Sequence, residues 1–267
     1  MLNYTIICIF LDIRVIMQQN SIKIYKPEDI VPMRKSCQLA KKVLDHIENY
    51  IEEGISTEEL DKICHDFIIK NNAIPAPLNY RGFPKSTCIS VNHVVCHGIP
   101  GPYKLRNGDI LNIDITVILD GWFGDTSRSY GIGKITNQAQ KLIDITKKAL
   151  DIGISAVKPH GFFGDIGYAI QNFVEKNGFS VVRDYCGHGI GQSFHEEPNV
   201  LHYGEKNTGP EILPGMFFTI EPMINTGSHK TKLQRDGWTV TTIDKSLSAQ
   251  FEHTISVTEN GIEVLTS

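Results

Sequence analysis

The chain of 267 residues lacks several features that would assign a protein to a class at once. Its six cysteines form no CxxC pair, which excludes a zinc knuckle or redox motif of that type, and their scattered spacing is typical of a reducing compartment. A net charge of −4 provides no global attraction to nucleic acid. The content of 41% hydrophobic and 21% charged residues excludes disorder and little else. The length suits one sizeable domain or two fused halves.

Long apolar runs are missing as well. Residues 1–17 are apolar, but Asp12 and Arg14 interrupt them, and a spanning helix needs about 20 apolar residues. The segment has neither a positive leader nor a small-residue cleavage site, which disfavours a secretory signal. We predict that residues 1–17 are a disordered extension, that Met17 is the natural start, and that residues 18–267 form one domain. An intact mass of the native protein that includes residues 1–16 would contradict this start.

Four helices are indicated by apolar spacing and by end signals. From Pro27 to Ile51, apolar residues recur at alternating intervals of three and four, which predicts one long amphipathic helix that ends before Gly54. Ser56 to Glu59 is a capping box for a second helix that reaches about Lys70. Further helices are expected over residues 137–154 and 165–176. Residues 73–83 are expected to be an extended loop, and the C-terminal part is strand-like with turns at 214–215 and 259–261.

The second and fourth helices share a pattern. Five residues of one recur in the other at a single constant offset: Leu60, Phe67, Ile68, Lys70 and Asn71 correspond to Ile166, Phe173, Val174, Lys176 and Asn177. Each helix pair then runs into strands. We therefore predict an α+β fold of two duplicated helix–helix–antiparallel-sheet halves, about 26–135 and 136–267, with a site at the seam.

A predicted hairpin brings two carboxylates together. Residues 111–119 alternate between apolar and polar, and Asp120-Gly121 is a two-residue turn signal. Asp125 then lies opposite Thr116, and the side chains of Asp114, Thr116 and Asp125 point to the same face. Diagonal neighbours of this kind have Cα atoms about 7–8 Å apart. Two divalent cations would relieve the repulsion between the carboxylates, whereas two solvated strand residues would need no metal. The hairpin alone leaves both interpretations open.

Three further residues can complete a metal site. His188 is flanked by glycines that allow close approach of the backbone, and a neutral imidazole suits first-row divalent metals. Glu221 and Glu252 interrupt apolar strand segments, where a glutamate either faces solvent or has a partner. With Asp114 and Asp125 they make four oxygen ligands and one nitrogen ligand. That set suits two ions such as manganese, iron or cobalt better than one structural zinc.

From Ile24 to the C-terminus the chain resembles the type I methionine aminopeptidases, which have the pita-bread fold. The resemblance is carried by short motifs in the same order: Ser90-Val91-Asn92, Cys96-His97-Gly98-Ile99-Pro100, Asn112-Ile113-Asp114, Gly124-Asp125-Thr126, Gly187-His188-Gly189-Ile190-Gly191, Phe194-His195-Glu196, Thr219-Ile220-Glu221-Pro222 and Gln250-Phe251-Glu252-His253-Thr254.

This resemblance implies the role of each site residue. Two divalent metals (cobalt, manganese, iron or zinc) would be held by Asp114, Asp125, His188, Glu221 and Glu252, with Asp125 and Glu252 shared between them. His97 and His195 would contact the substrate and stabilise the tetrahedral intermediate. Glu221 would also accept the proton of the attacking water. A water between two cations loses a proton near neutral pH.

The resemblance also implies a methionine pocket and a second ion site. The apolar pocket would consist of Tyr80, Phe83, Cys88, Phe194, Met223 and Trp238. A monovalent cation would lie at Asn92, Val94 and Ser248. Pro77 stands where bacterial relatives often have cysteine, so the pocket rim can differ.

The implied activity is removal of the initiator methionine from nascent chains whose second residue is small. The enzyme would be a cytoplasmic monomer in transient contact with the ribosome, and no nucleic acid or membrane partner is expected. The alternatives are a proline-specific peptidase of the same fold, which usually has a large additional N-terminal domain, and a type II enzyme, which has an insertion between His195 and Glu221. A non-catalytic binding protein of this fold tends to lose ligands, and none is missing here.

Overall fold

The computed structural model describes Gln19 and residues 21–267. The predictions for residues 1–17, including the start at Met17, lie outside this part of the chain. The helices are α2 (Ile30–Ile47), α3 (Thr57–Lys70), α4 (Asn137–Ala156), α5 (Phe163–Lys176), and the 3-10 turns η1 (Pro27–Asp29), η2 (Glu48–Tyr50) and η3 (Tyr80–Gly82). The strands are β1 (Ile74–Pro75), β2 (Cys88–Val91), β3 (Val94–Cys96), β4 (Ile110–Leu119), β5 (Trp122–Gly131), β6 (Ser180–Val181), β7 (Gly187–Gly189), β8 (Glu196–Val200), β9 (Phe217–Ile220), β10 (Met223–Asn225), β11 (Thr231–Leu233), β12 (Val240–Thr242), β13 (Ser248–Gln250), β14 (His253–Thr258) and β15 (Gly261–Val264).

The four predicted helices are all present. Pro27 opens the η1 turn that leads into α2, and η2 continues α2 to Tyr50. The capping box before α3 is confirmed, because Glu59 N donates to Ser56 Oγ (3.2 Å) and Ser56 N donates to the Glu59 carboxylate (2.8 Å). No helix in the described part of the chain combines the length and the apolar character that crossing a membrane would require.

The β4–β5 hairpin has the predicted register. Asp120 and Gly121 form the turn, Thr116 lies opposite Asp125, and Asp114 lies opposite Ser127. The segment predicted to be an extended loop over residues 73–83 contains two short elements, because β1 pairs with β4 and η3 forms one turn. A second sheet has the strand order β15-β14-β9-β7-β8, and two three-stranded sheets have the orders β13-β10-β6 and β11-β12-β3.

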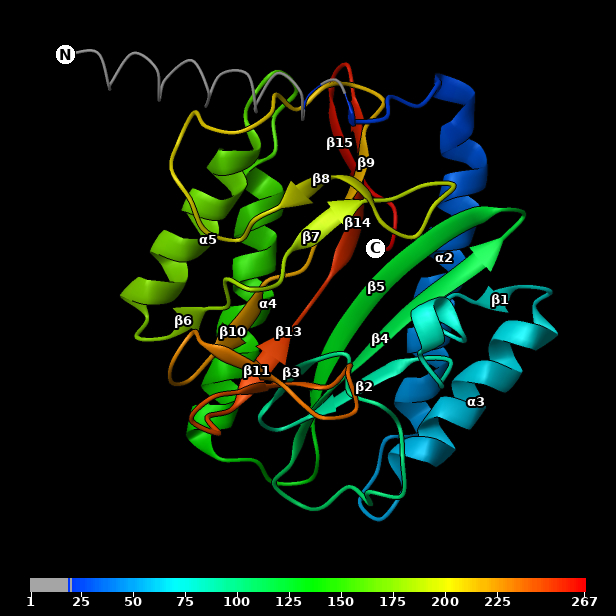
Figure 1. Ribbon diagram of the computed structural model, residues 1–267, viewed down its shortest axis with the longest axis vertical. Helices are drawn as coiled ribbons and strands as arrows, with labels where there is room; N and C mark the ends of the chain where they lie inside the picture. Colours follow the sequence, from blue (N-terminus) through cyan, green and yellow to red (C-terminus); the bar gives the residue numbers. More distant parts are fainter. Residues whose placement is uncertain (1–18, 20) are drawn as a thin grey trace.

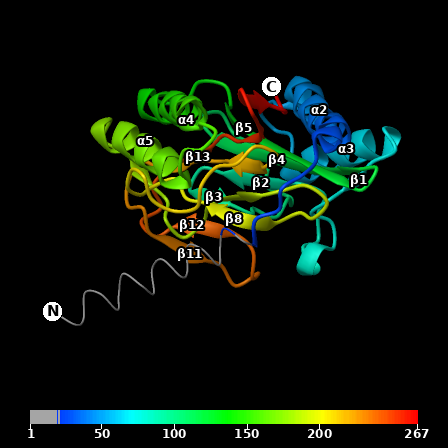
Figure 2. The same ribbon diagram turned by 90° about the horizontal axis from the view of Figure 1, so that it is seen from above.

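Two equivalent halves make up the fold. In the first half, α2 and α3 pack on β4 around one apolar core, and in the second half α4 and α5 pack on β9 and β14 around another. The two helix pairs lie side by side over the strands, as Figure 1 and Figure 2 show. Helices α3 and α5 have the same length, and their buried residues occupy the same five positions within each helix. This correspondence supports our proposed division into residues 26–135 and 136–267.

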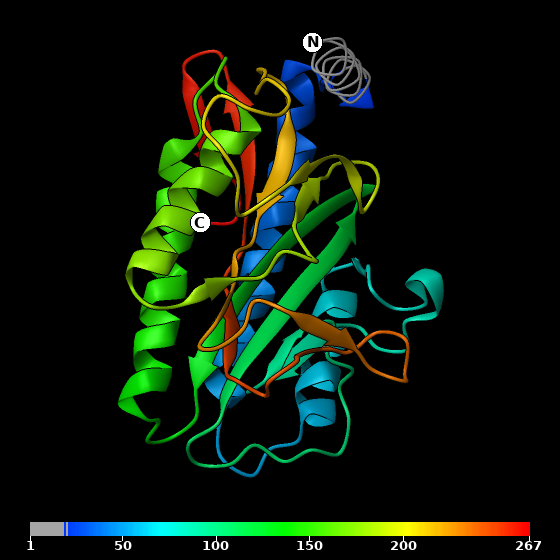
Figure 3. The ribbon, with the colours of Figure 1, turned by 60° about the vertical axis from the view of Figure 1, so that its left-hand side comes forward.

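The halves join along strand β5. Glu252 N donates to Ser127 O (3.1 Å), Thr126 Oγ1 donates to Glu252 O (2.7 Å), and Thr254 Oγ1 donates to Asp125 O (2.7 Å). Figure 3 shows β5 beside β14 at this seam. The hydrogen bonds fix Asp125 of one half against Glu252 of the other.

Candidate active site

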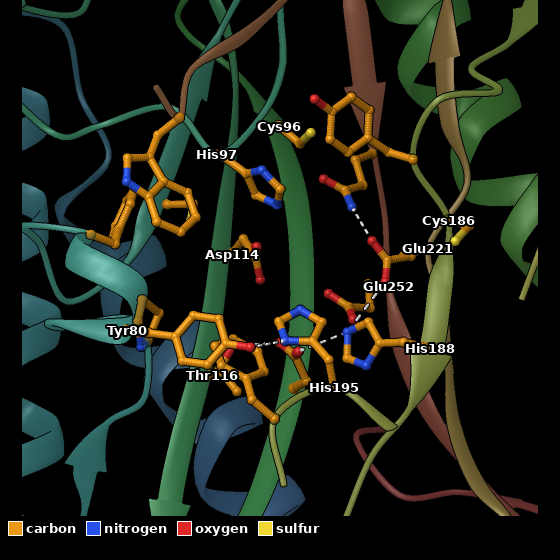
Figure 4. Close-up of a pocket in the computed structure, with 18 of the residues that line it drawn as sticks. Tyr80, Cys96, His97, Asp114, Thr116, Cys186, His188, His195, Glu221 and Glu252 are labelled. Carbon is orange, nitrogen blue, oxygen red and sulfur yellow. Dashed lines mark hydrogen bonds and ion pairs between the residues drawn. The ribbon is translucent and has the colours of Figure 1, made fainter. Parts of the chain in front are cut away.

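A pocket of about 320 Å³ opens at the seam between the halves. It gathers side chains that the sequence places far apart, and Figure 4 shows many of them converging. The pocket is lined by every predicted metal ligand, by both predicted substrate histidines and by the whole predicted apolar set: Asp114, Asp125, His188, Glu221, Glu252, His97, His195, Tyr80, Phe83, Cys88, Phe194, Met223 and Trp238.

The five candidate ligands come from three strands (β4, β5 and β7) and from two positions next to strand ends, Glu221 after β9 and Glu252 before β14. Ligand atoms of Asp125, His188 and Glu252 all lie within 4.8 Å of one another. His188 Nε2 is 3.7 Å from Glu221 Oε1 and 3.8 Å from Asp125 Oδ2. Asp114 faces the same pocket from β4. The structure thus brings all five together, with Asp125, His188 and Glu252 forming the tightest group.

Of the four carboxylates, those of Asp125 and Glu252 are buried, and those of Asp114 and Glu221 are partly buried. Burial raises the pKa of Asp114 to about 7, and burial with the charge of Asp114 raises the pKa of Glu221 to about 8. Burial and the neighbouring carboxylates raise the pKa values of Asp125 and Glu252 well above their usual range. Over the described residues, no lysine or arginine forms an ion pair with any of the four.

The donor set fits divalent metal ions. His188 Nδ1 is 2.9 Å from the carbonyl of Gly189, which leaves Nε2 directed at the carboxylates, and burial lowers the pKa of His188 to about 4, so the ring is neutral. Asp114 Oδ1 is buried and has no hydrogen-bond partner. A buried carboxylate oxygen without a donor is costly, and a cation between the carboxylates would remove that cost for the whole group.

Residues that are not candidate ligands hold the ligands in place. Most of these supporting residues could not be assigned a role from the sequence. Thr219 Oγ1 donates to Glu221 Oε1 (2.9 Å) and accepts from His188 N (3.0 Å). Gln250 Nε2 donates to Glu221 Oε2 (3.0 Å), and the buried His202 Nε2 accepts from Glu221 N (3.1 Å). Thr219 and Gln250 each precede a candidate ligand by two positions, and such residues share a strand face. That spacing was the signal in the sequence that could have predicted a place beside the ligands for Thr219 and Gln250.

Replacing Thr219 with valine should weaken metal binding by about 10- to 100-fold, the usual cost of losing an outer-shell partner. The change keeps the volume but removes the hydroxyl that joins His188 N to Glu221 Oε1. Calorimetric titration with manganese measures the affinity. Thr258→Val is the matched control, because the Thr258 hydroxyl bonds only within the β14–β15 turn. Equal affinities for the two variants would refute a positioning role for Thr219.

The two histidines without a predicted ligand role line the same pocket as the carboxylates. His195 Nδ1 is 3.0 Å from the hydroxyl of Tyr80, and its ring centroid is 4.3 Å from that of His188. Burial lowers the pKa of His195 to about 3 and also lowers that of His97. Both rings are therefore neutral near pH 7, and each carries one N–H that can be donated.

The predicted apolar residues line this pocket together, and four of them form two aromatic pairs. Tyr80 packs on Phe194 with ring centroids 4.9 Å apart, and Phe83 meets Trp238 edge-on at 5.2 Å. Pro77, the departure noted in the sequence, also lines this pocket. Outside it, Asn92 and Ser248 of the predicted monovalent-cation site are neighbours, since Ser248 N donates to Asn92 O (2.9 Å). That cation site stays a prediction.

Comparison with known proteins identifies the family. The sequence matches the description "Metallopeptidase family M24" over residues 32–259. A methionine aminopeptidase of Rickettsia prowazekii is 56% identical over 247 residues, which is 92% of this chain and 95% of that protein. One from Escherichia coli K12 is 55% identical over 248 residues, covering 92% and 94%. The chain belongs to metallopeptidase family M24.

Solved structures of similar proteins agree with the fold. The crystal structure of the Rickettsia prowazekii methionine aminopeptidase aligns with a TM-score of 0.91, covering 92% of this chain and 100% of that one. Prolidase from Pyrococcus furiosus aligns with a TM-score of 0.73 at 23% identity, and the match covers 67% of its chain, which shows the fold alone. The predicted pita-bread fold and the resemblance to methionine aminopeptidases are confirmed. This M24 protein is a metallopeptidase and thus a hydrolase.

Proposed function

We propose that the protein removes the initiator methionine from polypeptides whose second residue is small. The observation that carries this proposal is the cluster of four carboxylates and His188 in the same pocket as a set of aromatic side chains. The names of the relatives support the same activity. A long, unbranched thioether fits such an aromatic pocket.

Two divalent cations would be held by Asp114, Asp125, His188, Glu221 and Glu252, with Asp125 and Glu252 shared. When bound, such ions supply Lewis-acid polarisation of the scissile carbonyl, a partner for the free amine and a water that is deprotonated near neutral pH. In the same proposal, Asn92, Val94 and Ser248 would hold a monovalent cation.

The side chains of the protein supply the remaining steps. Glu221 accepts the proton of the attacking water on a carboxylate oxygen, and Thr219 and Gln250 hold that carboxylate in place. Neutral His97 and His195 donate N–H groups to the oxygen that becomes negative in the tetrahedral intermediate. Tyr80, Phe83, Cys88, Phe194, Met223 and Trp238 receive the methionine side chain. The substrate is a nascent chain at the ribosome, and the enzyme acts as a monomer in the cytoplasm.

The first test compares two peptides and three metals. Metal-stripped protein is assayed on Met-Ala-Ser and on an Ala-Pro peptide, with manganese, iron or cobalt added back. Metal-dependent release of methionine from Met-Ala-Ser supports the proposal and ranks the metals. Cleavage of the Ala-Pro peptide alone would assign the protein to the proline peptidases. Cleavage of neither peptide by protein that binds two metals would indicate a binding role.

Replacing His97 or His195 with alanine should lower kcat by about 100-fold or more, the usual cost of removing one donor to a developing oxyanion. Neither ring is a proposed metal ligand, so manganese affinity should stay near that of the wild type. Steady-state kinetics and calorimetry measure the two quantities. His160→Ala is the control, because His160 is exposed and pairs with Glu211 away from the pocket. A variant that loses metal binding in parallel with kcat would contradict the assigned role.

A further inference from the structure

A second cavity of about 400 Å³ adjoins the active-site pocket. The two share three consecutive lining residues, Asp184, Tyr185 and Cys186, so this segment separates one cavity from the other. The far side of the second cavity is built from the N-terminal end of α5, from residue Asn199 in β8 and from the loop after β8, which carries Leu201 and Tyr203. None of these residues has a role in the chemistry described above.

In the orientation that the proposed function gives it, the substrate chain runs toward this cavity. In the proposed function, the methionine side chain lies on the aromatic wall that includes Tyr80, and the scissile bond lies over the carboxylates. Figure 4 places Tyr80 on one side of the carboxylates and Cys186 on the other, next to Glu221 and His188. A chain that enters with its amino terminus and its first side chain at the Tyr80 side must therefore leave past Cys186. Each further residue of an extended chain advances about 3.5 Å.

The lining of the cavity favours an apolar side chain. Leu201 is 40% exposed, one of few large apolar residues so exposed in the described chain, and it faces this cavity together with Tyr203 and Pro210. Arg183, the basic residue that lines this cavity, already lies 5.4 Å above the Tyr203 ring and 3.7 Å from the Glu175 carboxylate. Its charge is thus partly compensated, which disfavours an acidic side chain as the main occupant. In addition, β8 is the edge strand of its sheet, a position suited to an extended peptide.

We propose that this cavity is a binding subsite for the substrate chain downstream of the cleaved bond, and that it accepts a large apolar side chain from the third to fifth residue of the peptide. This inference rests on the proposed function, because that function fixes the direction in which the substrate lies. It extends the specificity of the enzyme beyond the methionine and the small second residue.

The test measures kcat/KM of the manganese-loaded enzyme on Met-Ala-Ser and on pentapeptides that begin Met-Ala, with leucine or glycine at positions three, four and five in turn. Leucine at one position should raise kcat/KM by about five- to tenfold over glycine, as expected for partial burial of one apolar side chain. Leu201→Ser should abolish that leucine-to-glycine ratio. Leu233→Ser, which changes an exposed leucine of β11 outside the cavity, should keep it.

Two outcomes overturn the proposal: a leucine-to-glycine ratio near one at all three positions in the wild type, or a ratio that Leu201→Ser leaves intact. Because each variant is judged by a ratio between two peptides, a general loss of activity does not imitate the result. Failure of the proposed function is a separate observation, since Met-Ala-Ser itself would then release no methionine.

Discussion

Replacing Asp125 with alanine is expected to abolish metal-dependent release of methionine, with a loss of kcat/KM larger than the roughly 100-fold effect of an outer-shell change. Asp125 is the centre of the group: ligand atoms of His188 and Glu252 lie within 4.8 Å of its own, and Asp114 lies diagonal to it across the hairpin. In the proposed function Asp125 is shared by both metal ions, so its loss should change both metal sites. Calorimetry should find fewer than two manganese ions per chain in this variant.

Misfolding is the competing explanation for such a loss of activity. The stability of the metal-free variant distinguishes misfolding from the loss of a metal ligand. Because the pKa of Asp125 is raised by burial and by its acidic neighbours, removal of the carboxylate should cost the metal-free protein little beyond the hydrogen bonds from Thr116 Oγ1 (2.8 Å) and from the backbone of Thr126. The metal-free Tm of the variant should therefore stay close to that of the wild type. Asp144→Ala, an exposed position on α4, is the control for activity. Full activity in Asp125→Ala would refute the proposed metal site.

The hairpin and the helices could be predicted because their signals are local. Asp120-Gly121 sets the register of β4 and β5, and that register alone puts Asp114, Thr116 and Asp125 on one face. The capping box of Ser56 and Glu59 marks the start of α3 without reference to the rest of the chain. The short strand β1 was missed because its order comes from a distant partner: Ile74 and Pro75 pair with Ile118 and Val117.

The assembly of the site could be predicted only in part. His188, Glu221 and Glu252 could be singled out as unusual residues, but nothing local places them beside Asp125, since the seam depends on hydrogen bonds such as that from Glu252 N to Ser127 O. Resemblance to a family supplied that arrangement in advance. The role of His202 had no signal at all, because its ring reaches Glu221 N from a loop after β8 and not from the same strand.

The metal-free protein is expected to become less stable as the pH rises above about 6.5, and added metal should reverse this. The pKa of Asp114 is raised from 3.8 to about 7 and that of Glu221 from 4.5 to about 8 in the folded state. At these two carboxylates the folded protein therefore binds more protons than the unfolded chain between about pH 4 and pH 8. Stability from these groups is complete below the unfolded pKa values and is lost as the pH rises through the folded ones. At about 1.4 kcal/mol per pKa unit, the loss amounts to several kcal/mol.

Thermal unfolding measures this effect directly. The Tm of the metal-free protein should fall by on the order of 10 °C between about pH 6.5 and pH 8.5, a range in which the buried histidines with lowered pKa values are already neutral. Excess manganese should raise Tm far more at the higher pH, where the carboxylates are ionised and repel one another. The double variant Asp114→Asn with Glu221→Gln removes two of the four titrating groups and should flatten the metal-free profile. A metal-free Tm that rises over this range, or a manganese effect that is larger at pH 6.5 than at pH 8.5, would contradict the conclusion that like charges destabilise this site until a cation joins them.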